Sequence, residues 1–169
     1  KYVIAIDQGT SGSKAILIYN KGRIVAVSKK YSISANYPKP GWVEYIPEDL
    51  LQSVIRAIRS IVKQANIEIK DIECIGLANQ GESIIAFNKK TGEPVYPVIS
   101  WQDRRNTEVI SMLERDVNID DIKTKTGLIP NTYFSAIKIN WIIKNVPLAQ
   151  RLIRQKKLCI STTDTWLLY

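Results

Sequence analysis

Residues 2–19 read YVIAIDQGTSGSKAILIY, with two apolar runs on either side of a short polar segment. Both runs are rich in β-branched and aliphatic side chains, which pack well on a pleated, half-buried surface. A short polar segment that contains glycine commonly joins two strands in a hairpin. The stretch therefore predicts an antiparallel hairpin whose two strands are both largely buried.

The polar loop of this hairpin has the composition of a phosphate-binding turn. It holds the carboxylate of Asp7, two glycines, three hydroxyl side chains and a lysine. Glycines let the backbone approach a ligand closely, and a carboxylate at the end of a buried strand can anchor a hydrated Mg²⁺. Gly, Ser and Asp also favour ordinary turns, so a plain polar hairpin loop stays open as the alternative.

Composition is typical of a soluble globular protein. The 169 residues, 45% hydrophobic and 24% charged, fit one ordinary domain with a hydrophobic core. No apolar run is long enough to span a bilayer, and no signal-peptide layout is visible. Cys74 and Cys159 lie far apart in apolar contexts and are interpreted as buried thiols. We therefore expect a cytoplasmic protein without a membrane partner.

The chain contains no histidine, which excludes histidine-based triads and the usual zinc sites. Any acid–base chemistry must rest on Asp, Glu, Lys or Tyr. The net charge of +8 suits an anionic partner, but the basic residues are scattered. The densest group, within residues 151–157, looks like one solvated face, so an anionic small molecule is favoured over nucleic acid.

Strand and helix signals follow one another along the rest of the chain. A third strand is expected from Arg23 to Ala35, and an amphipathic helix from Pro47 through Ala65. Ser53 is expected on the polar face of this helix. Further strands are expected at 72–78, 84–87, 95–100 and 158–160, and helices at 103–113, capped by Asp103, at 120–127 and from 135 to Pro147. This order predicts an α/β fold: a mixed sheet with the N-terminal antiparallel hairpin and flanking helices.

Four stretches, in order along the chain, carry a resemblance to a known family. They are IDQGTSGSK (6–14), PGWVE (40–44), NQGE (79–82) with SWQDRR (100–105), and YFS (133–135) followed by TDTWL (163–167). Together they resemble the FGGY carbohydrate kinases, most closely the glycerol kinase branch and next the xylulokinases. The resemblance implies a ribonuclease-H-like, actin-like ATPase fold, with two such domains and the active site in the cleft between them. Residues 1–169 resemble the N-terminal domain, and we expect the second domain and the catalytic base aspartate to lie outside this chain.

The resemblance also implies roles for the residues of the hairpin loop. Thr10, Ser11 and Gly12 match positions that contact the phosphates of ATP, although Gly12 replaces a serine. Lys14 stands in place of an arginine, which keeps the charge but loses bidentate geometry. Asp7 matches the acidic residue near the Mg²⁺ ion and the transferred phosphoryl group, and is the one residue here expected to take part in catalysis.

A second set of residues matches the sugar-binding positions of the family. Glu82 and Tyr133 match polyol-binding positions, and Trp101 matches an aromatic wall of the sugar pocket. Gln80 and Gly81 belong to the same substrate-binding stretch, but Gly81 replaces an arginine that binds the polyol hydroxyls in the glycerol kinase branch. That departure puts glycerol in doubt and leaves room for a longer substrate. The alternatives are that Trp101 is part of the hydrophobic core, that Tyr133 packs at a helix start and that Glu82 is a surface carboxylate.

The neighbouring motif Gln102-Asp103-Arg104-Arg105 is interpreted as a helix cap and a structural salt bridge rather than as a set of catalytic contacts.

The resemblance favours an ATP-dependent kinase of a polyol or ketose sugar, inactive as this chain alone and compatible with a homodimer. An actin- or Hsp70-like ATPase that phosphorylates no sugar is the main alternative, because the Asp7 loop suits both. A ribonuclease-H-like nuclease ranks lower, because two-metal chemistry needs several clustered carboxylates and the first strand supplies only Asp7.

Overall fold

The computed structural model describes residues 1–169, which divide into two compact units. Unit 1 comprises residues 1–35, 45–80 and 168, and unit 2 comprises residues 36–44, 81–167 and 169. Each unit has its own sheet. The sequence predicts one mixed sheet, whereas the strands after Gln80 form a second sheet together with residues 44–45.

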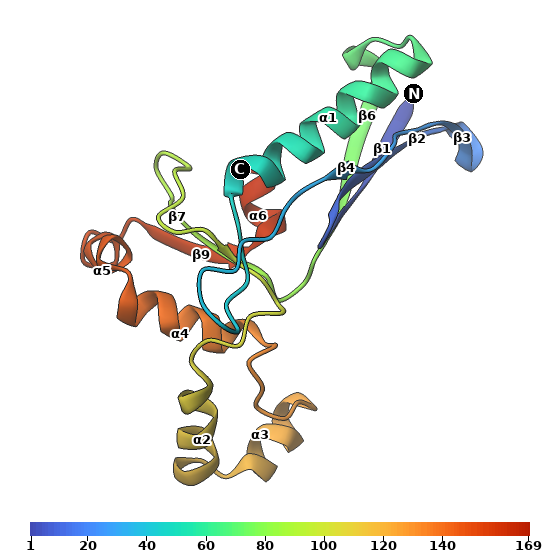
Figure 1. Ribbon diagram of the computed structural model, residues 1–169. Coiled ribbons are helices and arrows are strands. Elements are labelled where there is room, and N and C mark those ends of the chain that lie inside the picture. Colours follow the sequence, from blue (N-terminus) through green and yellow to red (C-terminus); the bar gives the residue numbers. More distant parts are fainter. The chain divides into compact units, whose positions relative to one another are not determined.

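The predicted N-terminal hairpin is confirmed. β1 (Tyr2–Gly9) pairs antiparallel with β2 (Gly12–Tyr19), with Ile4 opposite Leu17 (Figure 1). Side chains alternate between two faces of a strand, so one face of this pair is apolar. That face supplies the buried residues Ile4, Ile6, Ala15 and Leu17.

The third strand is shorter than predicted. β3 (Arg23–Val27) follows the 3₁₀ turn Asn20–Gly22 and pairs with β2, and β4 (Tyr31–Ser32) pairs separately with the start of β2. Between them Ser28 interrupts the ladder, because its hydroxyl accepts a hydrogen bond from the Ala15 N–H and donates one to the Lys29 carbonyl. A polar side chain that bonds to nearby backbone offers the chain an alternative to strand pairing.

A parallel strand makes the first sheet mixed, as predicted. β6 (Ile72–Asn79), which follows the 3₁₀ turn Ile69–Asp71, pairs parallel with β1, and the main strand order is β3-β2-β1-β6. The expectation that this strand is buried is wrong, because β6 is the outer strand and four consecutive residues from Glu73 to Gly76 are exposed. Cys74 is among them and Cys159 is only half-buried, so neither is the buried thiol that was expected.

Helix α1 (Pro47–Ala65) begins and ends where the sequence predicts (Figure 1). Pro47 starts it, Glu48 and Asp49 lie in its first turn, and Asn66 ends it in the left-handed conformation (φ 50°). Its apolar face packs on the first sheet, mainly on β2. Ser53, expected on the polar face, is buried: its Oγ lies 2.7 Å from the Ser13 Oγ of β2 and donates to the Leu50 carbonyl.

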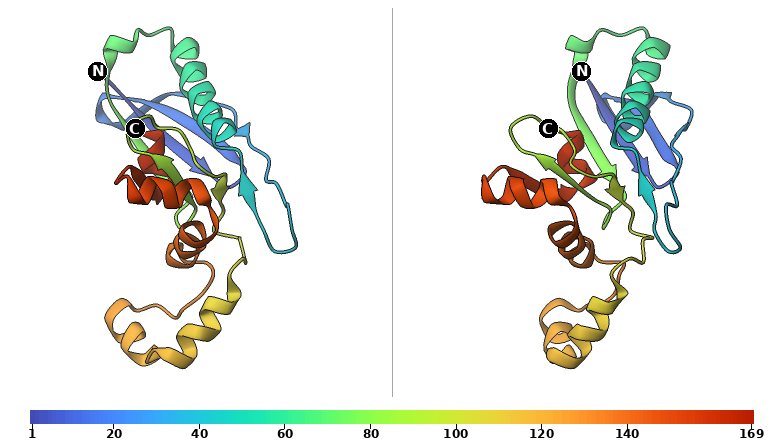
Figure 2. Two further views of the ribbon diagram at one scale, coloured as in Figure 1. Left: turned by 90° about the vertical axis from the view of Figure 1, so that its left-hand side faces the viewer. Right: turned by 60° about the vertical axis from the view of Figure 1, so that its left-hand side comes forward.

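Unit 2 is built on the sheet order β5-β8-β7-β9. These strands are β5 (Glu44–Tyr45), β7 (Ile84–Asn88), β8 (Val98–Ile99) and β9 (Leu158–Thr162), and β7 runs antiparallel to both neighbours. Helices α4 (Ser135–Asn145) and α5 (Pro147–Arg154) lie beside this sheet (Figure 2). They bury Ile142, Val146 and Ala149 against Ile84, Ala86 and Ile99.

The remaining helices differ from the predictions mainly at their starts. α3 (Ile119–Thr126) ends at Gly127 as predicted, and α6 (Thr163–Leu167) follows β9. α2 (Thr107–Asp116) begins four residues after Asp103, which therefore does not cap it. Pro147 both follows α4 and occupies the first turn of α5. None of the helices combines the length and apolar character needed to cross a bilayer.

Candidate functional site

The hairpin loop places the predicted phosphate-binding residues at one end of the first sheet. Thr10 and Ser11 lie between the strands, and Asp7 and Lys14 face each other as cross-strand partners in the β1–β2 ladder. Both charged side chains are exposed. The loop therefore presents a carboxylate, an ammonium group and two hydroxyls over a short distance along the chain.

Gly12 has a conformation that only glycine adopts readily. Its φ is +144°, and a Cβ at this position would collide with the Tyr31 carbonyl oxygen and lie 2.8 Å from the Ser32 Cα of β4. Backbone in this region is sterically closed to most side chains. A serine, as the resemblance gives at this position, would need β4 to move, so Gly12 can offer a ligand only its backbone.

Ser11 and Gln80 already have partners inside unit 1. The Lys30 ammonium donates to the Ser11 Oγ at 3.2 Å. Gln80, which the resemblance assigns to the substrate, is buried, and its Nε2 donates to the Gln8 Oε1 at 3.4 Å. Gln8 in turn donates to the Gly9 carbonyl at 2.8 Å, so the two amides support the loop. A role of Gln80 in substrate binding stays a prediction.

The structure offers Mg²⁺ one carboxylate at this loop. No group of three or more Cys, Asp or Glu side chains that could hold a metal ion occurs in residues 1–169. Hydrated Mg²⁺ keeps several waters and commonly uses only one or two carboxylates together with the phosphates of its substrate. The exposed Asp7 carboxylate at the end of β1 fits that mode of binding.

Two of the predicted sugar-pocket residues come together in unit 2. The rings of Trp101 and Tyr133 meet edge to face, with centroids 5.8 Å apart. They belong to the wall of a pocket of about 360 Å³ formed by residues 101–104 and 131–133. Aromatic rings next to backbone and polar side chains suit a ligand with both C–H faces and hydroxyl groups.

Glu82 connects its loop to helix α4. Its Oε2 accepts hydrogen bonds from the Ser135 N–H at 2.5 Å and from the Ser135 hydroxyl at 2.6 Å. Ser135 is the first residue of α4, whose own N-cap residue supplies no side-chain hydrogen bond, so Glu82 acts as a cap from outside the helix. Glu82 also has φ 63°, a strained value for a non-glycine residue. The adjacent Gly81 is exposed, and a Cβ added there would meet open space.

The predicted structural salt bridge in the SWQDRR motif is confirmed. Asp103 and Arg105 are both buried and form two hydrogen bonds of 2.8 Å, from the Arg105 Nε and Nη2. The predicted helix cap by Asp103 is wrong, because its Oδ2 instead accepts from the Val43 N–H at 2.6 Å. The Arg105 guanidinium also binds Glu44 at 2.7 Å.

Aromatic rings surround the Arg105 guanidinium. Its central carbon lies 4.0 Å from the centroid of the Trp42 ring and 4.5 Å from that of Trp141. Burial tends to lower the pKa of Arg105, but the hydrogen bonds with Asp103 and Glu44 outweigh it and raise the pKa. Burial and the hydrogen bond to Glu44 raise the pKa of the Tyr96 hydroxyl. Asp103 is also one of the residues that line the pocket, so it connects this cluster to the pocket wall.

Lys138 is a buried charged residue that no sequence pattern indicated. Its side chain is 1% exposed, on helix α4, and its ammonium donates to the backbone of the 132–134 turn. Burial lowers its pKa to about 8, although the carboxylates of Glu82 and Asp103 act in the opposite direction. A lysine in an amphipathic helix is normally exposed, and no local pattern distinguishes this one.

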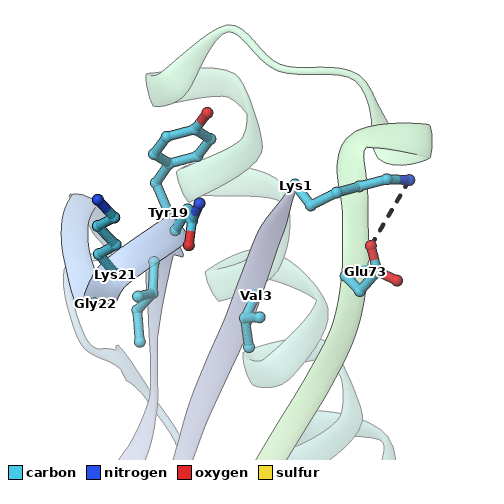
Figure 3. Close-up of a pocket in the computed structure, with 8 residues that line it drawn as sticks. Lys1, Val3, Tyr19, Lys21, Gly22 and Glu73 are labelled. Carbon is cyan, nitrogen blue, oxygen red and sulfur yellow. Dashed lines mark ion pairs between the residues drawn. The ribbon is translucent and has the colours of Figure 1, made fainter.

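A larger hollow, of about 510 Å³, lies at the opposite end of the β1–β2 hairpin from the polar loop (Figure 3). Lys1, Val3, Tyr19, Lys21, Gly22 and Glu73 are among its lining residues, and Lys1 pairs with Glu73 at 3.7 Å. None of the predicted site residues lines it.

Comparison with known proteins gives one consistent family. The model for the N-terminal domain of the FGGY family of carbohydrate kinases matches residues 2–169. The glycerol kinase of Mycoplasmoides gallisepticum is 39% identical over 169 residues, which are the whole chain and 33% of that protein. The glycerol kinase of Parabacteroides distasonis is 41% identical over the whole chain and 34% of its own length. The chain thus spans about a third of the length of the curated relatives it matches.

Solved structures agree with these sequence relatives. A crystal structure of Plasmodium falciparum glycerol kinase with ADP has a TM-score of 0.88 and 32% identity, and covers 98% of this chain and 33% of that one. A xylulose kinase from Rhodospirillum rubrum has a TM-score of 0.83 at 20% identity, covering 99% of this chain and 33% of that one, and supports the fold alone. The predicted actin-like fold class is confirmed.

Proposed function

Because the chain belongs to the FGGY family of carbohydrate kinases, as its N-terminal domain, we propose that the complete protein phosphorylates a polyol or ketose sugar with ATP. The γ-phosphoryl group of ATP is transferred to a sugar hydroxyl. The pocket wall formed by Trp101 and Tyr133 is the observation that carries this proposal, because both residues match sugar-binding positions and their rings meet around one cavity.

In this proposal the two units bind different substrates. The Asp7–Lys14 loop of unit 1 binds the phosphates of ATP and a hydrated Mg²⁺, while unit 2 binds the sugar. Phosphoryl transfer depends mainly on positioning and on neutralising charge at the phosphoryl oxygens. The exposed charges of Asp7 and Lys14 are suited to the metal and the phosphates respectively.

The sugar would contact aromatic faces and one carboxylate oxygen. Glu82 uses Oε2 for both hydrogen bonds to Ser135 and does not itself line the 360 Å³ pocket; in this proposal its other oxygen, Oε1, accepts hydrogen bonds from sugar hydroxyls. The open space at Gly81 favours a substrate longer than glycerol. We further propose that the enzyme works in the cytoplasm, on a small-molecule substrate rather than a nucleic acid or a membrane; a homodimer is compatible with this.

The test is sugar-dependent ATP turnover by the full-length protein. ADP release is measured with Mg²⁺ and each of glycerol, erythritol, ribitol, D-xylulose and D-ribulose, and without sugar. The proposal predicts that at least one sugar raises the rate a hundredfold or more. Equal rates with and without every sugar would contradict the proposal and support the ATPase alternative.

A matched pair of variants links the activity to the pocket. Trp101→Leu should raise the Michaelis constant for the sugar at least tenfold, because stacking against the ring is lost. Tyr37→Leu removes an aromatic side chain that is 72% exposed and does not line the pocket of Trp101, and should leave that constant unchanged.

A further inference from the structure

Lys138 donates to three successive backbone carbonyls of one turn. Its Nζ lies 2.9 Å from the Thr132 oxygen, 2.5 Å from the Tyr133 oxygen and 3.2 Å from the Phe134 oxygen. An ammonium group has three protons, and here each has one carbonyl to bind. Lys138 lies on helix α4, which begins directly after the turn. Its side chain therefore reaches back to the backbone four to six residues earlier in the chain.

The same turn is fixed through its amide groups. The Tyr133 N–H donates to the Asn131 Oδ1 at 2.8 Å, and the Phe134 N–H donates to the Asn131 carbonyl at 3.2 Å. The Ser135 N–H donates to Glu82 at 2.5 Å. The amides are thus bound by Asn131 and Glu82, and Lys138 supplies every side-chain contact to the carbonyls of Thr132, Tyr133 and Phe134.

The turn carries one wall of the pocket. Asn131, Thr132 and Tyr133 all line the pocket, and the Tyr133 ring packs edge to face on both Trp101 and Phe134. Lys138 does not line the pocket. Its direct contacts are with the turn, so it can influence a ligand there through the position of the turn.

We propose that Lys138 is a positioning residue of the sugar site, which holds the 132–134 turn so that Tyr133 meets Trp101 across the pocket. This inference rests on the proposed function, because it assigns a sugar to that pocket. The residue must be a lysine for a geometric reason. Three carbonyls converge on one nitrogen, and the planar guanidinium of arginine points its N–H groups in a fixed fork instead.

The charge of Lys138 agrees with this role. Burial lowers the pKa of Lys138 to about 8, and the carboxylates of Glu82 and Asp103 partly oppose this, so the ammonium form still predominates at pH 7. A buried ammonium that keeps its charge is stabilised by acceptors placed around it. Replacing Lys138 by an apolar side chain would leave the three carbonyls of a buried turn without their donor.

The first measurement is amide hydrogen exchange in the full-length protein. Lys138→Met should speed exchange of the Tyr133, Phe134 and Ser135 amides at least tenfold relative to wild type. Lys144→Met is the matched control, because Lys144 lies on the same helix, is exposed and has no contact with the turn. Unchanged exchange at these three amides in Lys138→Met would overturn the proposal.

The second measurement is steady-state kinetics with the best sugar of the panel glycerol, erythritol, ribitol, D-xylulose and D-ribulose. Lys138→Met should raise the sugar KM at least fivefold and leave the KM for ATP within twofold. A purely structural role would instead reduce kcat in proportion to the folded fraction and leave both KM values unchanged, and that result would also overturn the proposal.

Lys138→Arg keeps the inference testable if the methionine variant does not fold. It retains a cation but not the three-proton geometry, so the sugar KM should rise at least threefold; an unchanged KM would refute the role. If wild type phosphorylates no sugar of the panel, the proposed function fails. The exchange data still decide whether Lys138 holds the turn.

Discussion

Arg105 and Asp103 form a buried ion pair whose carboxylate also binds a backbone amide from a distant part of the chain. Two guanidinium nitrogens donate to the two Asp103 oxygens at 2.8 Å each, and the Val43 N–H, 60 positions away in sequence, donates at 2.6 Å. Glu44 adds a second carboxylate at 2.7 Å from Arg105. The pair therefore holds the PGWVE motif beside the SWQDRR motif.

Removing Arg105 should destabilise the protein strongly. Arg105→Met would leave Asp103 and Glu44 buried without their cation, and such a change typically costs about 3–5 kcal/mol. We expect a loss of this size in the free energy of unfolding, measured by urea denaturation of the full-length protein. Arg115→Met, at an exposed helical position, is the control and should change it by no more than about 0.5 kcal/mol. A loss below about 1 kcal/mol in Arg105→Met would contradict a structural role.

Glu82 is expected to serve both the helix and the sugar. Glu82→Ala should raise the sugar KM and also lower the free energy of unfolding by about 1–2 kcal/mol, because α4 loses its cap. Ser135→Ala removes only the hydroxyl contact and should have smaller effects in the same directions. Kinetics and denaturation of both variants check this. If Glu82→Ala changed stability alone, Glu82 would be a structural carboxylate and not a sugar ligand.

Local patterns predicted the parts of the fold that depend on nearby residues. The 2–19 hairpin and helix α1 were correct because alternation, Pro47 and a one-sided apolar face act within a few residues. Ser53 was placed on the wrong face because its partner, the Ser13 hydroxyl, lies 40 positions away. The burial of β6 was overestimated because apolar composition does not show which strand lies at the edge of a sheet.

The candidate site was predicted only in part. Resemblance selected Trp101 and Tyr133, and their rings do meet around a pocket. It gave no role to Lys138, because its three acceptors exist as a group only once the 132–134 turn has folded. Asp103 was assigned to the nearest helix start, whereas the folded chain supplies the stronger partners Arg105 and Val43.

Gly81 should limit the use of glycerol by the complete enzyme. Charged hydrogen bonds are worth about 1.5–3 kcal/mol each, and each 1.4 kcal/mol corresponds to about a factor of ten. A side chain fits at this position, so Gly81→Arg should raise kcat/KM for glycerol about tenfold or more. Gly81→Met is the matched control, since it has similar length but no donors, and should give no gain. Wild-type enzyme that already prefers glycerol to ribitol and xylulose would refute this argument.

The pKa of Lys138 predicts how stability depends on pH. It is lowered by burial from 10.5 to about 8 in the folded chain, so between these values the unfolded state binds more protons. The free-energy cost of burying the charged form of Lys138 is fully present below pH 8 and disappears as the pH rises through 10.5. The stability of wild type relative to Lys138→Met should therefore increase from pH 8 to 10.5, by about 3 kcal/mol at most, at about 1.36 kcal/mol per pKa unit. Denaturation curves of both proteins across this range test the sign, and a flat or falling difference would contradict it.

Asp7→Asn should lower turnover far more than it weakens sugar binding. Asp7 ends β1 at the loop assigned to ATP, and belongs to unit 1, whereas Trp101 and Tyr133 belong to unit 2. A carboxylate there would hold Mg²⁺ directly or through water, and the ion would neutralise charge on the phosphoryl oxygens. Asn is nearly isosteric, and Asp7 is exposed, so folding should be retained.

The informative comparison is between kcat and the sugar KM at saturating Mg²⁺ in the full-length enzyme. For Asp7→Asn we expect kcat to fall by a factor of a hundred or more while the sugar KM stays within threefold, since the lost interaction develops in the transition state. Lys21→Gln is a suitable control because it removes a charge from the opposite end of the hairpin. If Asp7 were only a turn residue, one neutral hydrogen bond of about 0.5–1.5 kcal/mol would be at stake, and it would act on stability rather than on the chemical step. Turnover within twofold of wild type in Asp7→Asn would remove this loop from the mechanism and leave unit 2 as the sole support for the proposed kinase.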